Sequence, residues 1–75
     1  MKRVGDVVST AQGLLVARCP ADEHPDIGAP VIDENLDSVG RVVDVFGPVE
    51  RPYVAVTPAS GVVPDAMLGQ KLYAR

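Results

Sequence analysis

The chain has 75 residues, of which 47% are hydrophobic and 23% charged, and its formal net charge is −3. This composition is globular and the length supports one small core, so we expect a single domain over residues 1–75. Tight, sequence-independent binding of RNA or DNA needs a basic surface, which makes an acidic chain a poor candidate for direct nucleic-acid binding.

The lone cysteine, Cys19, excludes an intramolecular disulfide and indicates a reducing compartment. Asp6, Gln12 and Arg18 interrupt the apolar run that a signal peptide would need after Met1-Lys2-Arg3. No stretch approaches the length of a transmembrane span, so we expect no membrane partner.

Valine-rich runs punctuated by Gly, Pro, Asp and Asn predict short strands and turns. In chain order, we expect strands over residues 4–9, 14–18, within 27–32, 39–46, 53–57 and 71–74, with a short helical turn at 67–69. No segment carries a sustained helical period. Six short strands predict an all-β fold, a small closed six-stranded β-barrel, because closure removes exposed strand edges.

The run 39–46 is the strongest strand pattern, and regular alternation would make both of its faces apolar. Val43 and Val45 would then lie on one face, and Val42 and Phe46 on the other. A half-buried strand is apolar on one face only. We therefore expect this strand either to be covered on both sides or to meet a partner with its outer face.

The segment 44–53 is the most informative part of the chain. It is apolar and contains two prolines, whereas most turns are polar. It contains Phe46 and Tyr53, two of the three aromatic residues. The residues alone leave two interpretations open, a stiff hairpin whose aromatic rings close the barrel end, or an apolar docking surface for a partner protein.

Two acidic clusters have simpler explanations than metal binding. The first combines a histidine with acidic residues in one Pro-flanked loop, at Asp22, Glu23, His24 and Asp26. It lacks the fixed spacing of three or four ligands, so we interpret it as a solvated loop. The second, Asp33, Glu34 and Asp37, lacks the complete calcium-loop pattern and is typical of a turn.

No set of residues predicts catalysis. Cys19 lies near His24 in sequence, but catalytic pairs meet through the fold, and a small inert cysteine is the simpler interpretation. The seven Lys and Arg residues are scattered, and no Gly-rich phosphate loop is present. We therefore expect a chain that is not an enzyme, with no cofactor, no metal and no small-molecule substrate.

Three segments resemble the glycine-arginine-rich subunit of box H/ACA ribonucleoproteins. They are Gly-Ala-Pro-Val-Ile-Asp-Glu at 28–34, Val-Gly-Arg-Val-Val-Asp-Val-Phe-Gly-Pro-Val at 39–49, and Pro-Tyr-Val-Ala-Val at 52–56. Residues 4–7 with 13–16, and 68–73, are similar to the same pattern. The resemblance therefore covers nearly the whole chain, and its most specific string is Asp-Val-Phe-Gly-Pro-Val-x-x-Pro-Tyr.

The resemblance implies a six-stranded barrel that acts as a noncatalytic subunit in rRNA pseudouridylation and ribosome biogenesis. It implies docking on the catalytic domain of a TruB/dyskerin-type pseudouridine synthase, where the subunit helps to position the synthase's thumb loop for substrate loading and product release. Guide and substrate RNA would be reached only indirectly. The sequence has no Arg/Gly-rich tail, which is similar to the compact archaeal form and implies the cytoplasm of an archaeal cell.

The same family string indicates which residues contact the synthase. The contacts implied by the string are Phe46, Gly47, Pro48, Val49, Pro52 and Tyr53. The two-sided strand pattern adds Val43 and Val45 to this surface.

Two other β-barrel classes are alternatives. Residues 28–35 and 39–45 are also similar to the hairpin of PRC-type barrel interaction modules, although the Phe-Gly-Pro-Val loop and Pro52-Tyr53 argue against that class. A barrel that binds single-stranded nucleic acid would need exposed stacking aromatics on a basic face. One Phe and two Tyr in an acidic chain give that alternative little support.

Overall fold

The computed structural model describes residues 2–20 and 24–75. Its strands are β1 (Lys2–Ala11), β2 (Leu14–Arg18), β3 (Pro30–Ile32), β4 (Ser38–Phe46), β5 (Tyr53–Pro58) and β6 (Lys71–Ala74), and a short 3-10 helix, η1, spans Pro64–Met67. All six expected strands are therefore present, with β1 longer than predicted. The helical turn expected at 67–69 begins earlier because Pro64, near its start, has a φ preset for a helix.

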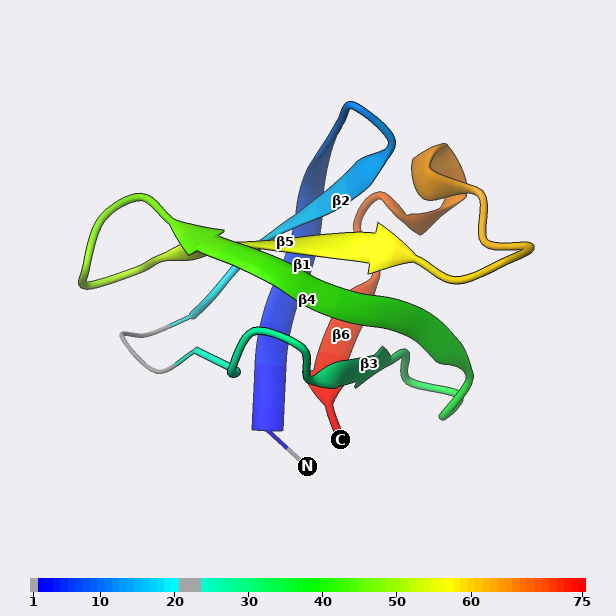
Figure 1. Ribbon diagram of the computed structural model, residues 1–75, viewed down its shortest axis with the longest axis horizontal. Coiled ribbons are helices and arrows are strands. Elements are labelled where there is room, and N and C mark those ends of the chain that lie inside the picture. The colour runs from blue at the N-terminus through cyan, green and yellow to red at the C-terminus, as the bar shows by residue number, and fades with distance from the viewer. Residues whose placement is uncertain (1, 21–23) are drawn as a thin grey trace.

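The six strands close into a barrel in the order β1-β2-β5-β4-β3-β6, and every neighbouring pair is antiparallel. Figure 1 shows β4 and β5 crossing in front of β1, with the β4–β5 loop and η1 at opposite sides of the molecule. This arrangement confirms the predicted all-β, closed six-stranded barrel. Within the described residues, no helix is long and apolar enough to cross a membrane.

The core is built from aliphatic residues and one cysteine. The largest fully buried side chains are Leu15, Leu72, Val4, Val31, Val39, Val42, Val54, Val56 and Cys19. Among the described residues, no aromatic ring belongs to this core, and no polar side chain is buried in it. Small β-branched side chains suit the interior of a narrow barrel, where strands pack closely around the axis.

Two register shifts disturb the regular alternation predicted for residues 39–46. The partners of β3 jump from Ser38 to Gly40, and the partners of β5 jump from Val42 to Asp44. Each shift inserts an extra residue into β4, as a β-bulge does. As a result, Val39 and Val42 are both buried, whereas Val43 stays 41% exposed. The prediction of two regular faces was therefore wrong for this strand.

Gly40 is required by the close approach of β4 to β5. A Cβ atom at this position would overlap the backbone oxygen of Thr57, which the ladder between the two strands holds in place. Because a backbone atom cannot move aside as a flexible side chain does, residue 40 has no room for a larger residue.

The substitution Gly40→Ala is therefore expected to destabilise the barrel by roughly 3 kcal/mol or more, because it forces β4 and β5 apart. Urea unfolding measures this loss. Gly61→Ala is the control, since nothing lies within 4 Å of its added Cβ and only its positive φ is penalised. Equal losses of stability from the two substitutions would contradict the close approach of β4 to β5 at Gly40.

Candidate protein-docking surface

The loop between β4 and β5 presents apolar residues to solvent. Val49 is 82% exposed and Phe46 is 45% exposed, and Gly47 and Pro48 beside them are also exposed. Figure 1 shows this loop extending away from the barrel at the end of β4. Contiguous exposed apolar groups of this kind mark interaction sites on soluble proteins.

Other predicted contact residues anchor the base of the loop instead of lining its tip. Pro52 is buried, and its carbonyl oxygen accepts a hydrogen bond of 2.9 Å from the backbone N–H of Cys19. Val45 is partly buried and packs against the core. These two residues fix both strands where they leave the barrel, so the exposed tip between them has a defined position.

Phe46 and Tyr53 form a stacked pair on the outside of the barrel. The two residues are partners in the β4–β5 ladder, their ring centroids are 5.6 Å apart, and their planes differ by 22°. Neither ring belongs to the core cluster, and Phe46 is 45% exposed. The two stacked rings form an apolar surface beside the loop.

Gly47 sets the direction in which the loop leaves this stack. Its φ is +89°, a conformation that side-chain-bearing residues rarely adopt. A Cβ at residue 47 would also lie 2.8 Å from Cδ2 of Tyr53. The chain therefore turns here close to the Tyr53 ring, and Pro48 then fixes the next φ.

Arg18 extends the aromatic stack onto β2. Its guanidinium carbon lies 5.7 Å from the centroid of the Tyr53 ring, and Arg18 and Tyr53 are partners in the β2–β5 ladder. This distance is within the range of a cation–π interaction. In the sequence, Arg18 is one of seven scattered Lys and Arg residues and was not predicted to belong to this surface. No local signal could have found it, because β2 and β5 are far apart in the chain.

A small pocket lies beside the loop. It has a volume of about 200 Å³ and is lined by Val45, Phe46, Gly47, Pro48, Val49, Pro52 and His24. Pockets for small molecules and cofactors usually span about 300–1,000 Å³, so this one fits a single side chain better than a ligand of that size. Its walls are mainly apolar.

The acidic clusters have local structural roles where they are described. Oδ1 of Asp33 accepts hydrogen bonds from the backbone N–H groups of Asn35 and Asp37, at 2.9 and 3.0 Å, which closes the β3–β4 turn. Asp22 and Glu23 lie outside the described residues. Nδ1 of His24 lies 3.0 Å from the carbonyl oxygen of Pro25. Residues 2–20 and 24–75 bring together no group of three metal-ligand side chains.

Cys19 is fully buried in the core. Burial raises the pKa of its thiol above the ordinary value of 9.0, while the nearby Lys2 ammonium lowers it by a smaller amount. The thiolate is the reactive form, so a raised pKa makes this cysteine a weak nucleophile at neutral pH. The structure thus agrees with the interpretation of Cys19 as a core residue.

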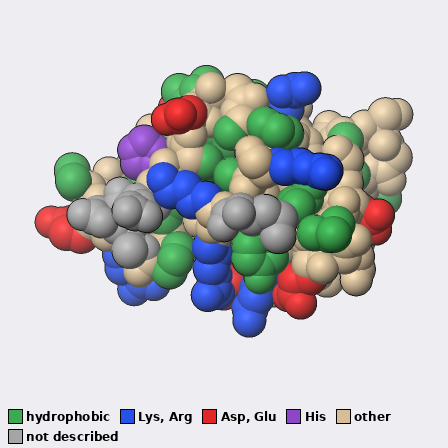
Figure 2. All heavy atoms as spheres, turned by 90° about the horizontal axis from the view of Figure 1, so that it is seen from below, with side chains coloured by type: hydrophobic (Ala, Val, Ile, Leu, Met, Phe, Trp, Pro, Cys, Tyr) green, Lys and Arg blue, Asp and Glu red, His purple; other side chains and the backbone are tan. Residues whose placement is uncertain are grey.

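Basic side chains do not form one block on the face that Figure 2 shows. Lys and Arg groups are spread among hydrophobic side chains and backbone atoms there. Among the described residues, Arg3 and Asp6 make the only ion pair, at 3.3 Å, and both side chains are about half exposed. The face in Figure 2 therefore shows no continuous basic stripe of the kind that supports tight binding to a phosphate backbone.

The comparison with known families decides between the two resemblances. All of residues 1–75 match the family described as the Gar1/Naf1 RNA binding region. The chain belongs to the Gar1/Naf1 family. This membership confirms the resemblance to the glycine-arginine-rich subunit, and it favours that class over a PRC-type module.

Relatives of this Gar1/Naf1 family chain occur in archaea and fungi. An uncharacterised protein of Methanothermobacter thermautotrophicus is 31% identical over 97% of this chain and 82% of its own length. An uncharacterised protein of Methanocaldococcus jannaschii is 43% identical over 65% of this chain and 57% of its own length. The H/ACA ribonucleoprotein complex subunit GAR1 of Debaryomyces hansenii is 31% identical over 93% of this chain. The chain spans 33% of that fungal protein's length.

The substitution Gly47→Ala is expected to move the loop relative to the Phe46–Tyr53 stack, because the added methyl group meets the Tyr53 ring. Stability should fall by about 1–3 kcal/mol, from positive φ and the overlap together. NMR chemical shifts of the two rings measure the displacement. Gly28→Ala is the matched control, since its φ is +93° and its added Cβ meets nothing within 4 Å. Unchanged ring shifts in Gly47→Ala would contradict this description.

Proposed function

We propose that this chain is a noncatalytic protein subunit of a box H/ACA ribonucleoprotein. In this proposal the β4–β5 loop docks on the catalytic domain of a TruB/dyskerin-type pseudouridine synthase. The observation that carries it is the exposed apolar loop, with Val49 82% exposed at its tip, in a member of the Gar1/Naf1 family. Its role would belong to rRNA pseudouridylation and ribosome biogenesis in the cytoplasm of an archaeal cell.

The names of the fungal relatives support the subunit role. Several are H/ACA ribonucleoprotein complex subunits named GAR1, and each matches over most of this chain. The chain corresponds to about a third of their length, 32–35% in the examples from Chaetomium, Coccidioides and Botryotinia. The matched part is the barrel, so the proposed role is one that the barrel can perform.

The geometry of the loop favours a docking role over a purely structural one. Its base is held by the Pro52 carbonyl and by the packing of Val45, and Pro48 presets one φ, so fewer backbone angles remain to be fixed on binding than in a loop without these anchors. A preorganised apolar segment loses little conformational entropy when it docks, and the area that it buries then contributes directly to affinity. Exposed Phe46 and half-buried Tyr53 would add aromatic contacts, which are common among binding hot spots.

The subunit would act on catalysis through the position of the synthase's thumb loop. A docked barrel that contacts one thumb position better than another shifts that equilibrium by the difference in its two affinities. Such a bias would assist substrate RNA loading and product release without supplying a catalytic group. All reacting groups would belong to the synthase.

The proposal places RNA in indirect contact with this chain. The family description names RNA binding, whereas the net charge of −3 and the spread of Lys and Arg favour a surface that contacts protein. The chain would therefore join guide and substrate RNA through the synthase to which it binds.

The substitution Val49→Asp tests this proposal. It places a charge in the expected apolar interface, so affinity for an archaeal TruB/dyskerin-type synthase should fall by about 30-fold or more. Isothermal titration calorimetry, with size-exclusion chromatography of the mixture, measures the change. Folding should be unaffected, because the side chain is 82% exposed.

Val63→Asp is the matched control, since Val63 is 62% exposed and lies beside η1, away from the loop. Its affinity should equal that of the unmodified chain. The docking surface is wrong if the two variants bind equally well. If the unmodified chain fails to bind the synthase, the subunit role itself is refuted.

A further inference from the structure

Arg18 is an exposed residue whose guanidinium lies over an aromatic ring. It stacks on the Tyr53 ring at 5.7 Å, and it forms no ion pair and no side-chain hydrogen bond with any described residue. The ring limits the freedom of the side chain, and no described residue occupies its N–H donors. A preorganised guanidinium loses less entropy per hydrogen bond than a mobile cation does.

Arg18 is also continuous with the loop surface. Because β5 lies between β2 and β4, Tyr53 stands between Arg18 and Phe46 on three adjacent strands. Phe46 in turn lines the pocket of about 200 Å³ beside Pro48 and Val49. One side of the molecule thus offers an apolar pocket, two stacked rings and one available cation in an unbroken row.

We propose that Arg18 binds a carboxylate of the partner protein, beside an apolar side chain that enters the pocket. This inference rests on the proposed docking function and adds the chemistry of the partner's surface. That surface would present an Asp or Glu next to a hydrophobic anchor. The planar guanidinium matches the geometry of a carboxylate, which can accept two parallel hydrogen bonds from its N–H groups.

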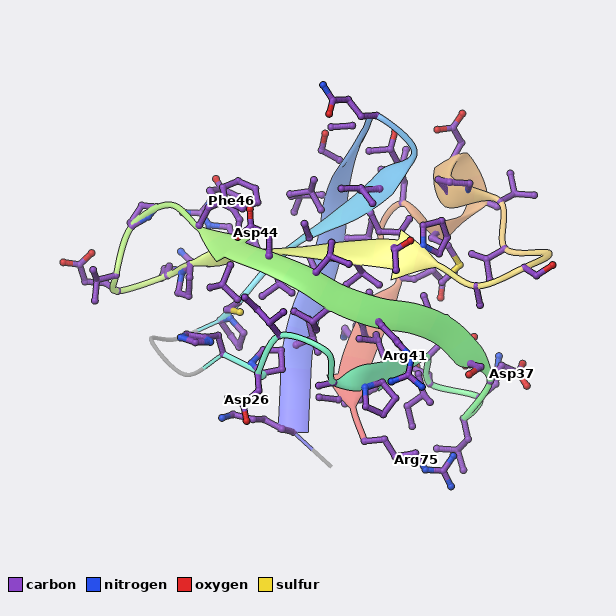
Figure 3. The ribbon with its side chains drawn as sticks, viewed as in Figure 1. Asp26, Asp37, Arg41, Asp44, Phe46 and Arg75 are labelled. Carbon is purple, nitrogen blue, oxygen red and sulfur yellow. The ribbon has the colours of Figure 1, made fainter. Side chains whose placement is uncertain are left out.

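Local charge favours a protein carboxylate over an RNA phosphate. Asp44 lies near Phe46 at the end of β4, as Figure 3 shows, and Glu50 belongs to the loop itself. A single carboxylate needs to contact only Arg18. A nucleic-acid backbone carries a charge at every nucleotide and would meet them along its path.

Substitutions at Arg18 test the proposal through their order of effect. Affinity for an archaeal TruB/dyskerin-type synthase should decrease from Arg to Lys, then Gln, then Glu. Lys keeps the charge but loses the planar fork, Gln loses the charge, and Glu repels the carboxylate. We expect Arg18→Gln to weaken binding to the synthase by about 10- to 100-fold. The difference in affinity between this variant and the unmodified chain should become smaller as salt rises from about 50 to 500 mM.

Arg75→Glu is the matched control, because it makes the same change in charge at the chain terminus, far from Phe46 in Figure 3. Urea unfolding of each variant reports whether the fold is retained. Equal losses of affinity from Lys, Gln and Glu would assign Arg18 a packing role and overturn the carboxylate proposal.

Two further outcomes separate this inference from the proposed function. If Val49→Asp abolishes synthase binding while all Arg18 variants bind normally, docking stands and the carboxylate contact is refuted. If Arg18→Glu weakens binding to a 12-nucleotide oligouridylate but not to the synthase, the ligand of Arg18 is a phosphate and the proposal is overturned.

Discussion

The pairing of β5 with both β2 and β4 is the interaction on which the rest of this structure depends. It closes the barrel, and it sets Tyr53 between Arg18 and Phe46 in one row of ladder partners. The same pairing brings the two ends of the loop together, so that Gly47 turns against the Tyr53 ring. A single register thus determines the core, the aromatic stack and the direction of the loop.

The composition of the core explains why the aromatic residues are available at the surface. The largest fully buried side chains are valines, two leucines and a cysteine, which suffice for an interior of this width. The barrel does not need Phe46 or Tyr53 for its closure, and both rings lie outside the core cluster. In a small domain, large side chains that the core does not use can serve binding, where they contribute the most area per residue.

Much of the fold could be predicted from the sequence, because the valine-rich runs and their Gly, Pro and Asp boundaries are local signals. The apolar loop was likewise found from its own residues, whereas six contact candidates came from the family resemblance and two, Val43 and Val45, from the strand pattern. The extra residue at Val43 could not be predicted, since a bulge depends on how β4 pairs with its neighbours. The contact between Arg18 and Tyr53 depends on two strands separated by more than thirty residues, so no local sequence pattern predicts it. The burial of Pro52 could not be predicted either, because its carbonyl oxygen bonds to Cys19, which is distant in the chain.

Hydrogen–deuterium exchange of this chain, alone and with an archaeal TruB/dyskerin-type synthase, tests the central claim most directly. It reports on backbone amides throughout the barrel and needs no substitution. The account predicts slower exchange for the amides of Gly47, Val49, Glu50 and Arg51 in the complex, with little change around η1 on the other side of the molecule. Protection confined to η1 or to the β3–β4 turn, with the loop still exchanging freely, would contradict it.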